Sequence, residues 1–417
     1  MEYGLIGAKL GHSYSKQIHE LLCGYRYELR ALPTEAEARA FLEKRPFKAI
    51  NVTIPYKKLV MEYCAYIDPR AAAIGAVNTV VNRSGVLCGY NTDYMGFAAL
   101  CQAHGVRFAG RTVLVLGTGG THNTVCAVAQ DQGAAQVLTV SRRPGPGQLS
   151  YAQAAASGAQ IVVNTTPAGM YPDVGVCSLD IRSMPGLEAV VDVVYNPSKT
   201  ELVLRAEEAG VPVAVGGLEM LVSQAVYAAG YFLGKPLEDP ERQTARITAA
   251  LRRQMLNVVL VGMPGAGKST IGRSLAQRLG RRFVDLDEEV VRAAGCSIPE
   301  IFAQKGEAAF REMESAQAAR WGKQSGLVIA CGGGAVLRSQ NVRALRQNGV
   351  VLFLDRPRQE LSTGGRPLST GADALERMEQ VRRPLYLAAA DAVIPNTTTA
   401  ACALAAAMEA LDEIFDR

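Results

Sequence analysis

The sequence predicts an α/β protein of several domains, each built around a mainly parallel sheet. Short runs of β-branched residues alternate with helical patterns almost from end to end, which is typical of β–α–β units. Two glycine-rich segments each follow an apolar strand and open a helix. The length of 417 residues exceeds what one ordinary core holds, so we expect two or three domains.

The predicted strands are short apolar runs that end at glycine, polar or turn residues. In the first part of the chain they are residues 3–7, 49–53, 112–117, 136–141, 161–165, 189–195 and 212–215. In the second part they are residues 257–261, 283–286, 327–331 and 350–354. Residues 82–85 separate two alternating runs and predict a hairpin, so the first sheet should contain one antiparallel element.

Residues 234–254 form the clearest break between domains. They contain two prolines and many charged residues without a strand pattern, which predicts a linker with some helix in it. A weaker boundary falls near residues 103–111, before the first glycine-rich segment.

The composition excludes several classes of function. The net charge of +5 is spread along the chain without basic blocks, which argues against nucleic-acid binding. No apolar run reaches the roughly 18 to 20 residues of a membrane helix, and an apolar strand begins at the N-terminus without a leader segment. The nine cysteines contain no CxxC pair. We therefore expect reduced thiols, no structural zinc, and a cytoplasmic enzyme that acts on small molecules.

The first glycine-rich segment predicts a dinucleotide site. Residues 114–124 read LVLGTGGTHNT, with Gly117, Gly119 and Gly120 between a strand and a helix. Glycine lets the backbone turn tightly and approach a pyrophosphate, and the helix N-terminus supplies free N–H groups. The next strand ends in Ser141 and Arg142, and an arginine at that position binds a 2′-phosphate, where NAD-binding proteins place an acidic residue. The pattern therefore favours NADP(H).

The second glycine-rich segment predicts a nucleoside triphosphate site. Residues 262–269 read GMPGAGKS between an apolar strand and a helix, and they match GxxxxGK[ST] in the context that this motif requires. The backbone N–H groups wrap the phosphates, Lys268 reaches the outer phosphates, and Ser269 coordinates Mg²⁺. The predicted contacts to ATP are Gly262, Gly265, Gly267, Lys268, Ser269 and Thr270.

A further set of motifs occurs before residue 237. They are HSYS at 12–15, NVTIPYK at 51–57, GAVNT at 75–79, GYNTD at 89–93, NTTPAGM at 164–170, DVVY at 192–195 and GGLEMLVSQ at 216–224. In this order and spacing, they closely resemble the shikimate dehydrogenase family. The resemblance implies an α/β substrate-binding subdomain, a Rossmann subdomain, and the reduction of 3-dehydroshikimate to shikimate by NADPH.

The same resemblance implies a role for individual residues. Lys57 and Asp93 match the catalytic pair, in which a lysine tuned by a neighbouring carboxylate manages the proton while NADPH provides the hydride. The residues that match substrate-binding positions are Ser13, Ser15, Thr53, Asn78, Tyr195 and Gln224. Those that match positions at the cofactor are Gly117, Gly119, Gly120, Ser141, Arg142, Gly217 and Met220.

The second half of the chain contains another ordered set of motifs. They are FVDLD at 283–287, SIPEIF at 297–302, GEAAFREME at 306–314, GGG at 332–334 and RRPLY at 382–386. This set resembles the shikimate kinase family from residue 254 onward. The resemblance implies a P-loop kinase domain like that of nucleoside monophosphate kinases, which phosphorylates shikimate with ATP.

The kinase resemblance also implies roles for individual residues. Asp287 orients or deprotonates the attacking hydroxyl, while Lys268 and Arg366 stabilise charge on the transferring phosphoryl group. The residues that match the shikimate site are Asp287, Arg311, Gly332, Gly333, Gly334 and Arg382, where forked arginines suit a carboxylate. The metal ligands implied are Ser269 directly and Asp285 through water.

Both halves depart from their families at a few positions. Lys16 stands where proline usually follows the second serine, and THNT at 121–124 replaces a run that normally contains arginine. Residues 144–151 are short and glycine-rich, and the kinase lid at about 361–374 is short. These departures concern cofactor affinity and lid closure more than the two reactions.

Several alternatives stay open at this point. The first half could be a quinate or quinate/shikimate dehydrogenase, which NAD preference would favour and Arg142 opposes. A gluconate or nucleotide kinase would leave GGG and Arg382 unexplained. One half could be inactive and regulatory, although Lys57, Asp93, Lys268 and Asp287 are all present.

The motifs together predict a domain plan. Residues 1–102 with 218–237 form the substrate-binding subdomain of the dehydrogenase, and residues 103–217 form its NADP-binding subdomain. Residues 238–254 are a linker, and residues 255–417 are the kinase. The oligomeric state is left open.

Overall fold

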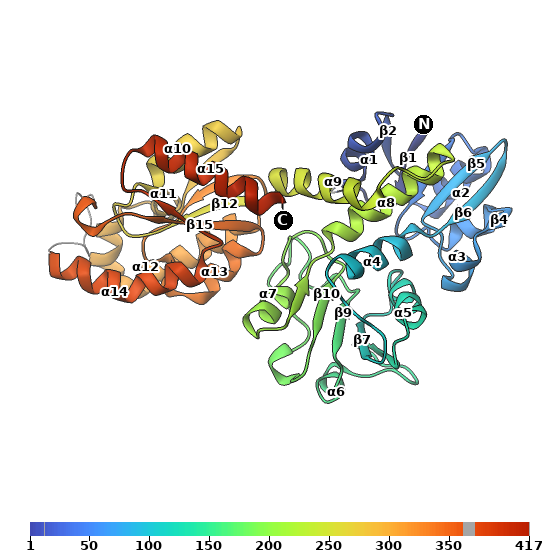
Figure 1. The fold of residues 1–417 in the computed structure, drawn as a ribbon, viewed down its shortest axis with the longest axis horizontal. Coiled ribbons are helices and arrows are strands. Elements are labelled where there is room, and N and C mark those ends of the chain that lie inside the picture. The colour runs from blue at the N-terminus through green and yellow to red at the C-terminus, as the bar shows by residue number, and fades with distance from the viewer. Residues whose placement is uncertain (12, 362–371, 417) are drawn as a thin grey trace. The chain divides into compact units, whose positions relative to one another are not determined.

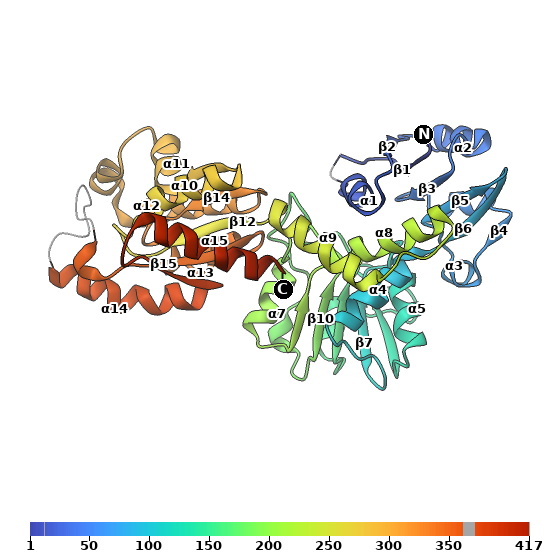
Figure 2. The same cartoon turned by 45° about the horizontal axis from the view of Figure 1, so that its top comes forward.

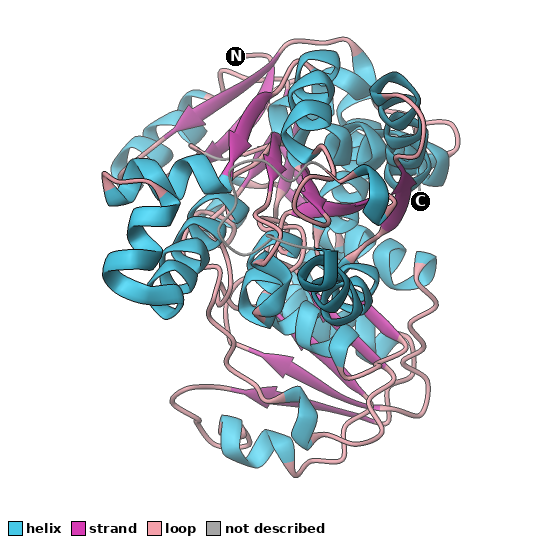
Figure 3. Cartoon of the chain, turned by 90° about the vertical axis from the view of Figure 1, so that its left-hand side faces the viewer, coloured by secondary structure: helices cyan, strands magenta, loops and turns pink. Residues whose placement is uncertain are grey.

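The computed structural model describes residues 1–11, 13–361 and 372–416, with the side chains of the last range from residue 375 onward. The chain forms three sheets, and Figures 1 and 2 show two of them in the first half of the chain and one in the second. Helices, cyan in Figure 3, surround the magenta strands. The α/β class with mainly parallel sheets is therefore confirmed.

The first sheet has six strands in the order β2-β1-β3-β5-β6-β4. Their bounds are β1 Tyr3–Gly7, β2 Tyr27–Ala31, β3 Ala49–Val52, β4 Tyr66–Ile67, β5 Thr79–Arg83 and β6 Val86–Tyr90. The β5–β6 pair is antiparallel, and Ser84 and Gly85 have positive φ at its turn. The predicted hairpin is therefore confirmed. The helices around this sheet are α1 Ser15–Cys23, α2 Glu35–Lys44 and α3 Pro69–Ile74.

The second sheet is parallel, with five strands in the order β11-β10-β9-β7-β8. Its strands are β7 Thr112–Leu116, β8 Gln136–Val140, β9 Ile161–Asn164, β10 Ala189–Asp192 and β11 Val213–Val215. Its helices are α5 His122–Asp131, α6 Tyr151–Ala155 and α7 Glu201–Glu208. Alternate residues of β7 belong to different cores, Val113 and Val115 to one and Leu114 and Leu116 to the other. Both faces of this sheet are therefore covered, as a parallel sheet requires.

Two long helices, α4 Thr92–Ala103 and α8 Leu218–Leu233, pack against each other near the first two sheets (Figures 1 and 2). Phe97 of α4 and Met220 of α8 join the core of the second sheet. Ala228 and Phe232, further along α8, join a core of the first sheet with Leu5. This pair of helices therefore ties the two sheets together.

The third sheet is parallel, in the order β13-β14-β12-β15-β16. Its strands are β12 Asn257–Val261, β13 Arg282–Asp285, β14 Leu327–Ala330, β15 Gly349–Asp355 and β16 Ala392–Pro395. Its helices are α10 Lys268–Leu279, α11 Leu286–Ala294, α12 Ile298–Gly322, α13 Ser339–Arg346, α14 Ala372–Ala389 and α15 Ala400–Asp416. Val258 and Leu260 face α10 and α15, whereas Val259 and Val261 face the core shared with α12, α13 and α14. The central strand is thus apolar on both faces.

The chain divides into two compact units. One holds Met1–Met170, Val176–Asn196 and Leu202–Thr248, and the other holds Tyr171–Gly175, Pro197–Glu201 and Ala249–Arg417. Helix α9, Pro240–Met255, spans this division and occupies the segment for which the sequence predicts a linker. Within the described residues, no helix has the length and apolar content that a bilayer span requires.

Candidate active sites

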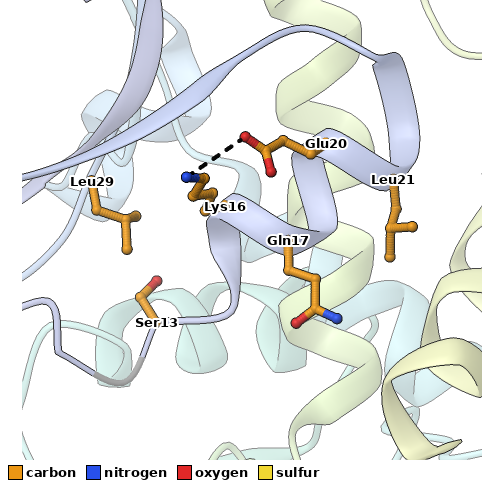
Figure 4. A pocket seen from close by; sticks show the side chains of 6 residues that line it. All are labelled: Ser13, Lys16, Gln17, Glu20, Leu21 and Leu29. Atoms are coloured by element: carbon orange, nitrogen blue, oxygen red, sulfur yellow. Dashed lines mark ion pairs between the residues drawn. The ribbon is translucent and has the colours of Figure 1, made fainter. Parts of the chain in front are cut away.

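The serine motif lies in the turn that joins β1 to α1. Ser13 Oγ donates a hydrogen bond to Ser15 Oγ over 3.1 Å and accepts one from the Ser15 backbone N–H. A pocket of about 450 Å³ is lined by Ser13, by residues of α1 and by Leu29 of β2 (Figure 4). Lys16, which departs from the family pattern, lines the same cavity, and its Nζ lies 4.0 Å from Glu20 Oε1. The departure therefore adds a cation beside the first serine, partly balanced by Glu20.

Lys57 and Asp93 form an ion pair at the edge of the first sheet. Lys57 Nζ donates to Asp93 Oδ2 over 2.6 Å, and the exposed fractions of the two side chains are 15% and 6%. Asp93 lies in the first turn of α4, which the Asn91 side chain caps by accepting from the Tyr94 N–H. The cap fixes this turn, and the low exposure strengthens the pair, because little water screens it.

Asn78 is held so that its amide nitrogen points toward Gln224 of α8. Its Oδ1 accepts hydrogen bonds from the Thr92 backbone N–H over 2.7 Å and from the Thr79 hydroxyl over 3.1 Å. The Asn51 amide in turn donates to Thr79 Oγ1. Because Oδ1 is occupied, Asn78 presents Nδ2, which reaches Gln224 Oε1 at 3.4 Å. The pair can therefore offer donors to hydroxyl or carboxylate oxygens of a ligand.

Gln224 reaches this position because α8 lies unusually close to α4. A Cβ on Gly96 of α4 would stand 2.7 Å from the Met220 carbonyl oxygen and 3.0 Å from the Gln224 backbone nitrogen. Only glycine allows this approach. The side chain of Met220, for which the sequence predicts a cofactor contact, is buried in the core.

Two more predicted residues lie near the serine motif. The backbone N–H of Thr53 bonds to Ile6 O at the ends of β1 and β3. Tyr195, which follows β10, makes an edge contact with Tyr14, with ring centroids 6.1 Å apart. Burial raises the pKa of Tyr195, so its hydroxyl keeps its proton and can donate to a ligand.

The dinucleotide loop follows β7 and enters α5. Gly117 has φ of 99°, and a Cβ there would stand 2.6 Å from Thr166, so the turn requires glycine. Side chains at Gly119 or Gly120 would meet no atom within 4 Å. Open backbone at a helix N-terminus fits a pyrophosphate. Gly217 is also needed for packing, because a Cβ there would stand 2.2 Å from Val193 O.

Arg142 lies exposed after β8. Its neighbour Ser141 accepts a hydrogen bond at Oγ from the Arg143 backbone N–H in the same turn. Arg142 makes no ion pair in the part of the chain that the structure describes, which leaves its guanidinium available to a 2′-phosphate. His122, in the departing run at the start of α5, contacts Thr139 of β8 at 2.9 Å through Nε2.

The phosphate loop joins β12 to α10. Gly262, Gly265 and Gly267 have φ of 147°, 85° and 87°, which glycine alone adopts without strain. Lys268 Nζ donates to the carbonyl oxygens of Gly262 and Met263 at 2.9 and 3.0 Å. The loop is therefore shaped for an anion, with a buried ammonium at its centre.

The predicted metal and acceptor residues meet beside this loop. Ser269 Oγ donates to Asp285 Oδ2 over 2.7 Å, which brings together two oxygen ligands of the kind Mg²⁺ prefers. Asp285 Oδ1 caps α11 by accepting from the Asp287 N–H. Asp287 lies beside the triple glycine, since a Cβ on Gly332 would stand 2.5 Å from Asp287 Oδ1.

The triple glycine also makes room for an arginine and a carboxylate. A Cβ on Gly334 would stand 2.2 Å from the Arg311 guanidinium. Arg311 donates to Glu314 over 2.8 Å and to Glu307 over 3.0 Å. Burial alone would lower the pKa of Arg311, but these two carboxylates outweigh it and the pKa is raised. The cation is therefore permanent and suits an anionic ligand.

Glu314 is a functional candidate that the sequence did not indicate. It is the last residue of the motif at 306–314, but the resemblance assigns it no role. It is buried, and burial raises its pKa although Arg311 and Arg382 act in the opposite direction. Its Oε1 has no hydrogen-bond partner among the described residues. Its position three residues after Arg311 on α12 is the signal that could have found it.

Arg382 lies on α14 and is buried near Glu314. Tyr386, one turn later, donates to Gly333 O, so α14 holds the triple glycine in place. Arg366 and the predicted lid at 361–374 fall almost wholly outside the described residues. Thr270, predicted at the nucleotide, is exposed at the start of α10.

The residues of these two sites define the class of protein. The first half pairs a dinucleotide loop with a lysine–carboxylate couple, as an oxidoreductase requires. The second half pairs a phosphate loop with an arginine-lined acceptor site, as a kinase requires. The chain is an oxidoreductase and a kinase in one polypeptide.

Comparison with known proteins gives the family. The sequence model of the shikimate dehydrogenase substrate binding domain matches residues 5–80, and that of shikimate kinase matches residues 264–415. The chain is 34% identical over 242 residues to a shikimate dehydrogenase (NADP(+)) of Clostridium beijerinckii, covering 54% of this chain and 89% of the relative.

Two solved structures agree with the fold of the first half. One is a chorismate mutase/shikimate 5-dehydrogenase fusion protein from Clostridium acetobutylicum, at 32% identity and a TM-score of 0.55 over 59% of this chain and 96% of that one. The other is quinate dehydrogenase from Corynebacterium glutamicum in complex with NAD, at 26% identity and a TM-score of 0.52 over 59% of this chain and 98% of that one.

The chain belongs to the shikimate dehydrogenase family and carries a shikimate kinase domain after it. It is a bifunctional enzyme of the shikimate pathway. NADP(H) for the first half, and ATP with Mg²⁺ for the second, are the cofactors that the sequence predicts, and these families use them. The open glycine backbone of the dinucleotide loop, the positive-φ glycines of the phosphate loop, the exposed Arg142, and the Ser269–Asp285 pair fit these groups.

Proposed function

We propose that the chain reduces 3-dehydroshikimate to shikimate with NADPH and then phosphorylates shikimate to shikimate 3-phosphate with ATP. The observation that carries the first step is the 2.6 Å Lys57–Asp93 pair. It is adjacent to Asn78, which bonds the residue before Asp93. A proton donor and a hydrogen-bonding group for a polyol thus lie close together at the start of α4. The order of the two steps follows from their chemistry, because the product of the first is the acceptor of the second.

The reductase step needs a proton on the carbonyl oxygen. NADPH supplies the hydride when bound. Lys57 Nζ holds the proton, and Asp93 Oδ2 keeps the ammonium in place. Asn78 and Gln224 orient the ring hydroxyls, while Ser13 and Ser15 hold the carboxylate. Tyr195 contacts Tyr14 between the two serines and offers its hydroxyl to the substrate.

The kinase step needs positioning and neutralisation of charge. Arg311 and Arg382 hold the carboxylate of the substrate, and Asp287 accepts a hydrogen bond from the hydroxyl that attacks. Lys268 leaves its carbonyl partners to pair with the outer phosphates. Ser269 and Asp285 would hold Mg²⁺, which neutralises the phosphate oxygens when bound. Arg366 adds a further cation.

Two observations bear on the quinate alternative. The quinate dehydrogenase noted above was solved with NAD, whereas Arg142 after β8 supplies a cation suited to a 2′-phosphate. The matching shikimate kinase domain also makes shikimate the common compound of both halves. We therefore favour shikimate over quinate.

The test is a pair of assays on intact chain and on two variants. We expect Lys57→Ala to reduce shikimate-dependent NADPH formation by about a hundred- to ten-thousandfold, because general acid–base groups contribute 10²–10⁴-fold, while shikimate-dependent ATP use is unchanged. Lys268→Ala should give the opposite result. Asp93→Ala should lose the dehydrogenase activity as Lys57→Ala does, and Asp287→Asn should lose the kinase activity as Lys268→Ala does.

The proposal would be wrong if the intact chain turned over neither shikimate with NADP nor shikimate with ATP. If the first half used quinate better than shikimate, it would be a quinate dehydrogenase instead. Activity of the Lys57→Ala and Asp93→Ala variants near the intact level would remove the catalytic pair.

A further inference from the structure

The end of β15 places an arginine beside the phosphate loop that no motif predicts. Arg356 follows the last residue of this strand, Asp355. A Cβ built on Gly267, the residue before Lys268, would stand 3.9 Å from Arg356 Nη1 and 3.4 Å from Asn396 Nδ2. The guanidinium therefore lies next to the last turn of the loop.

The surroundings hold this edge of the loop rigid. Asn396 is buried after β16. Its side-chain amide donates a hydrogen bond to Ala266 O over 2.8 Å, and its backbone N–H donates one to Asp355 O. Asp355 is paired with both guanidinium nitrogens of Arg383. Its charge is thus already neutralised, so Asp355 does not account for Arg356.

Arg356 is only weakly satisfied within the described chain. Its Nε is shielded from solvent and has no hydrogen-bond partner there. Glu360 Oε2 lies 3.6 Å from Nε, which is an ion pair but too long for a hydrogen bond. A half-buried guanidinium with a free donor is costly unless a ligand completes it.

The position of Gly267 in the loop tells which part of a nucleotide is near. In this motif the backbone N–H groups cradle the α- and β-phosphates, and the lysine reaches the β- and γ-phosphates. Arg356 approaches from β15, on the side of Gly267 opposite to Asp285 and Asp287, because β15 and β13 lie on opposite sides of β12 in the sheet. The acceptor site is therefore distant from it.

We propose that Arg356 is a nucleotide-binding residue, whose guanidinium contacts the α-phosphate end of the ATP phosphate chain. The inference rests on the ATP-binding role of the loop. Arg356 thus supplies a further cation at the phosphates, in addition to Lys268 and Arg366, from the end of β15. Without nucleotide, Glu360 pairs with the Arg356 guanidinium. When the nucleotide binds, its phosphate takes the place of that carboxylate and makes a closer, charge-assisted hydrogen bond to Arg356.

The test is calorimetric titration of the full chain with MgADP and MgATP, without shikimate. We expect Arg356→Ala to weaken both nucleotides about tenfold and by the same factor, since both carry the α-phosphate. Arg356→Lys should lose less, because it keeps the charge but not the fork. Arg358→Ala is the matched control: Arg358 pairs with Glu376 at 2.9 Å, and its loss should leave both affinities unchanged.

Several results would overturn the inference. Equal affinity in Arg356→Ala and intact chain would exclude the contact, and a loss confined to ATP would move it to the γ-phosphate. If Arg356→Ala does not fold, Glu360→Gln decides instead. Freed from the carboxylate, Arg356 should bind MgADP several-fold more tightly, and unchanged or weaker binding contradicts the proposal. Failure of the intact chain to bind either nucleotide would instead refute the ATP site itself.

Discussion

Arg142 is the residue on which we expect the choice of dinucleotide to depend. Its guanidinium is exposed after β8 and unpaired among the described residues. A charge-assisted bond to the 2′-phosphate contributes about 1.5–3 kcal/mol. We expect the intact chain to prefer NADP and Arg142→Ala to lose about ten- to a hundredfold of that preference. The measurement is kcat/KM for NADP and for NAD.

Arg143→Ala is the matched control for this prediction. Its backbone N–H is tied to Ser141, and the side chain is the next exposed arginine along the chain. It should change the preference little. Equal kcat/KM for the two dinucleotides in the intact chain would contradict the assignment of Arg142.

His19 makes the first half sensitive to acid. It is buried, stacks on Tyr27 with ring centroids 4.2 Å apart, and contacts the Tyr25 hydroxyl through Nδ1 at 2.7 Å. Burial lowers its pKa to about 3, against about 6.5 in an unfolded chain. Between these values the unfolded chain binds the extra proton, so stability is complete above about pH 6.5 and falls as the pH decreases.

The predicted slope is up to about 1.4 kcal/mol per pH unit for this one residue. We expect the thermal midpoint of dehydrogenase activity to fall between pH 7 and pH 5, and to fall less in His19→Phe, which keeps the stacking. Identical pH dependence in both proteins would show that His19 does not carry the effect.

At the scale of elements, the closeness of α4 and α8 shapes the substrate site. An alanine at Gly96 must separate the two helices, because its Cβ would meet backbone atoms of Met220 and Gln224. We expect Gly96→Ala to cost about 1–3 kcal/mol of stability and to raise KM for shikimate several-fold through the displacement of Gln224. Thermal denaturation and steady-state kinetics measure the two effects.

Gly230 in α8 provides the control for this substitution. A Cβ there would meet its nearest neighbour, Lys235 O, at 3.4 Å, an ordinary contact. Gly230→Ala should therefore be neutral or stabilise by about 0.4–1 kcal/mol, with unchanged KM. A Gly96→Ala protein that behaves like Gly230→Ala would show that the close approach is not required.

The sequence predicts the buried strands of the sheets well, but it misses the edge strands β2, β4 and β16. β12 and β7 appear as apolar runs because both of their faces are covered. The edge strand β2 reads YELRA, largely exposed, and has no such run. β16 is short and ends in Pro395, a residue that favours an edge but weakens the strand pattern.

The same limit applies to the sites. Motifs indicate Lys57, Asn78 and Lys268 because their chemistry depends on local spacing. They cannot give the direction of the Asn78 amide, which Thr79 and Thr92 fix. They also miss Arg356, because its relation to Gly267 arises only when two strands far apart in sequence become neighbours.

At the scale of the whole molecule, we expect the two activities to be separable. Each unit holds its own sheets and its own motifs. Two features complicate this. The division falls inside α9, with the buried Ile247 assigned to the first unit and the buried Leu251 and Met255 to the second, and Tyr171–Gly175 and Pro197–Glu201 also belong to the second unit. Fragments 1–248 and 240–417 each keep the part of α9 assigned to them.

We expect each of these fragments to retain kcat/KM within about tenfold of the intact chain. Fragments 1–237 and 250–417 should be less stable, because the first loses Ile247 and the second loses the first turns of α9. Thermal midpoints and kinetics of the four fragments test this. A larger loss, equal to more than about 1.4 kcal/mol of transition-state stabilisation, would mean that the units support each other.

The return of α8 to the first sheet has a consequence for synthesis on the ribosome. Leu5 and Tyr27 are covered by Ala228 and Phe232, so the earliest strands stay without part of their core until α8 emerges. At about 5–20 residues per second, the residues from 103 to 233 take roughly 7 to 26 s to add. During that interval the nascent chain exposes apolar surface of the kind that chaperones bind. A ribosome that stalls before residue 218 should therefore hold a chaperone-bound, protease-sensitive N-terminal segment rather than a finished domain.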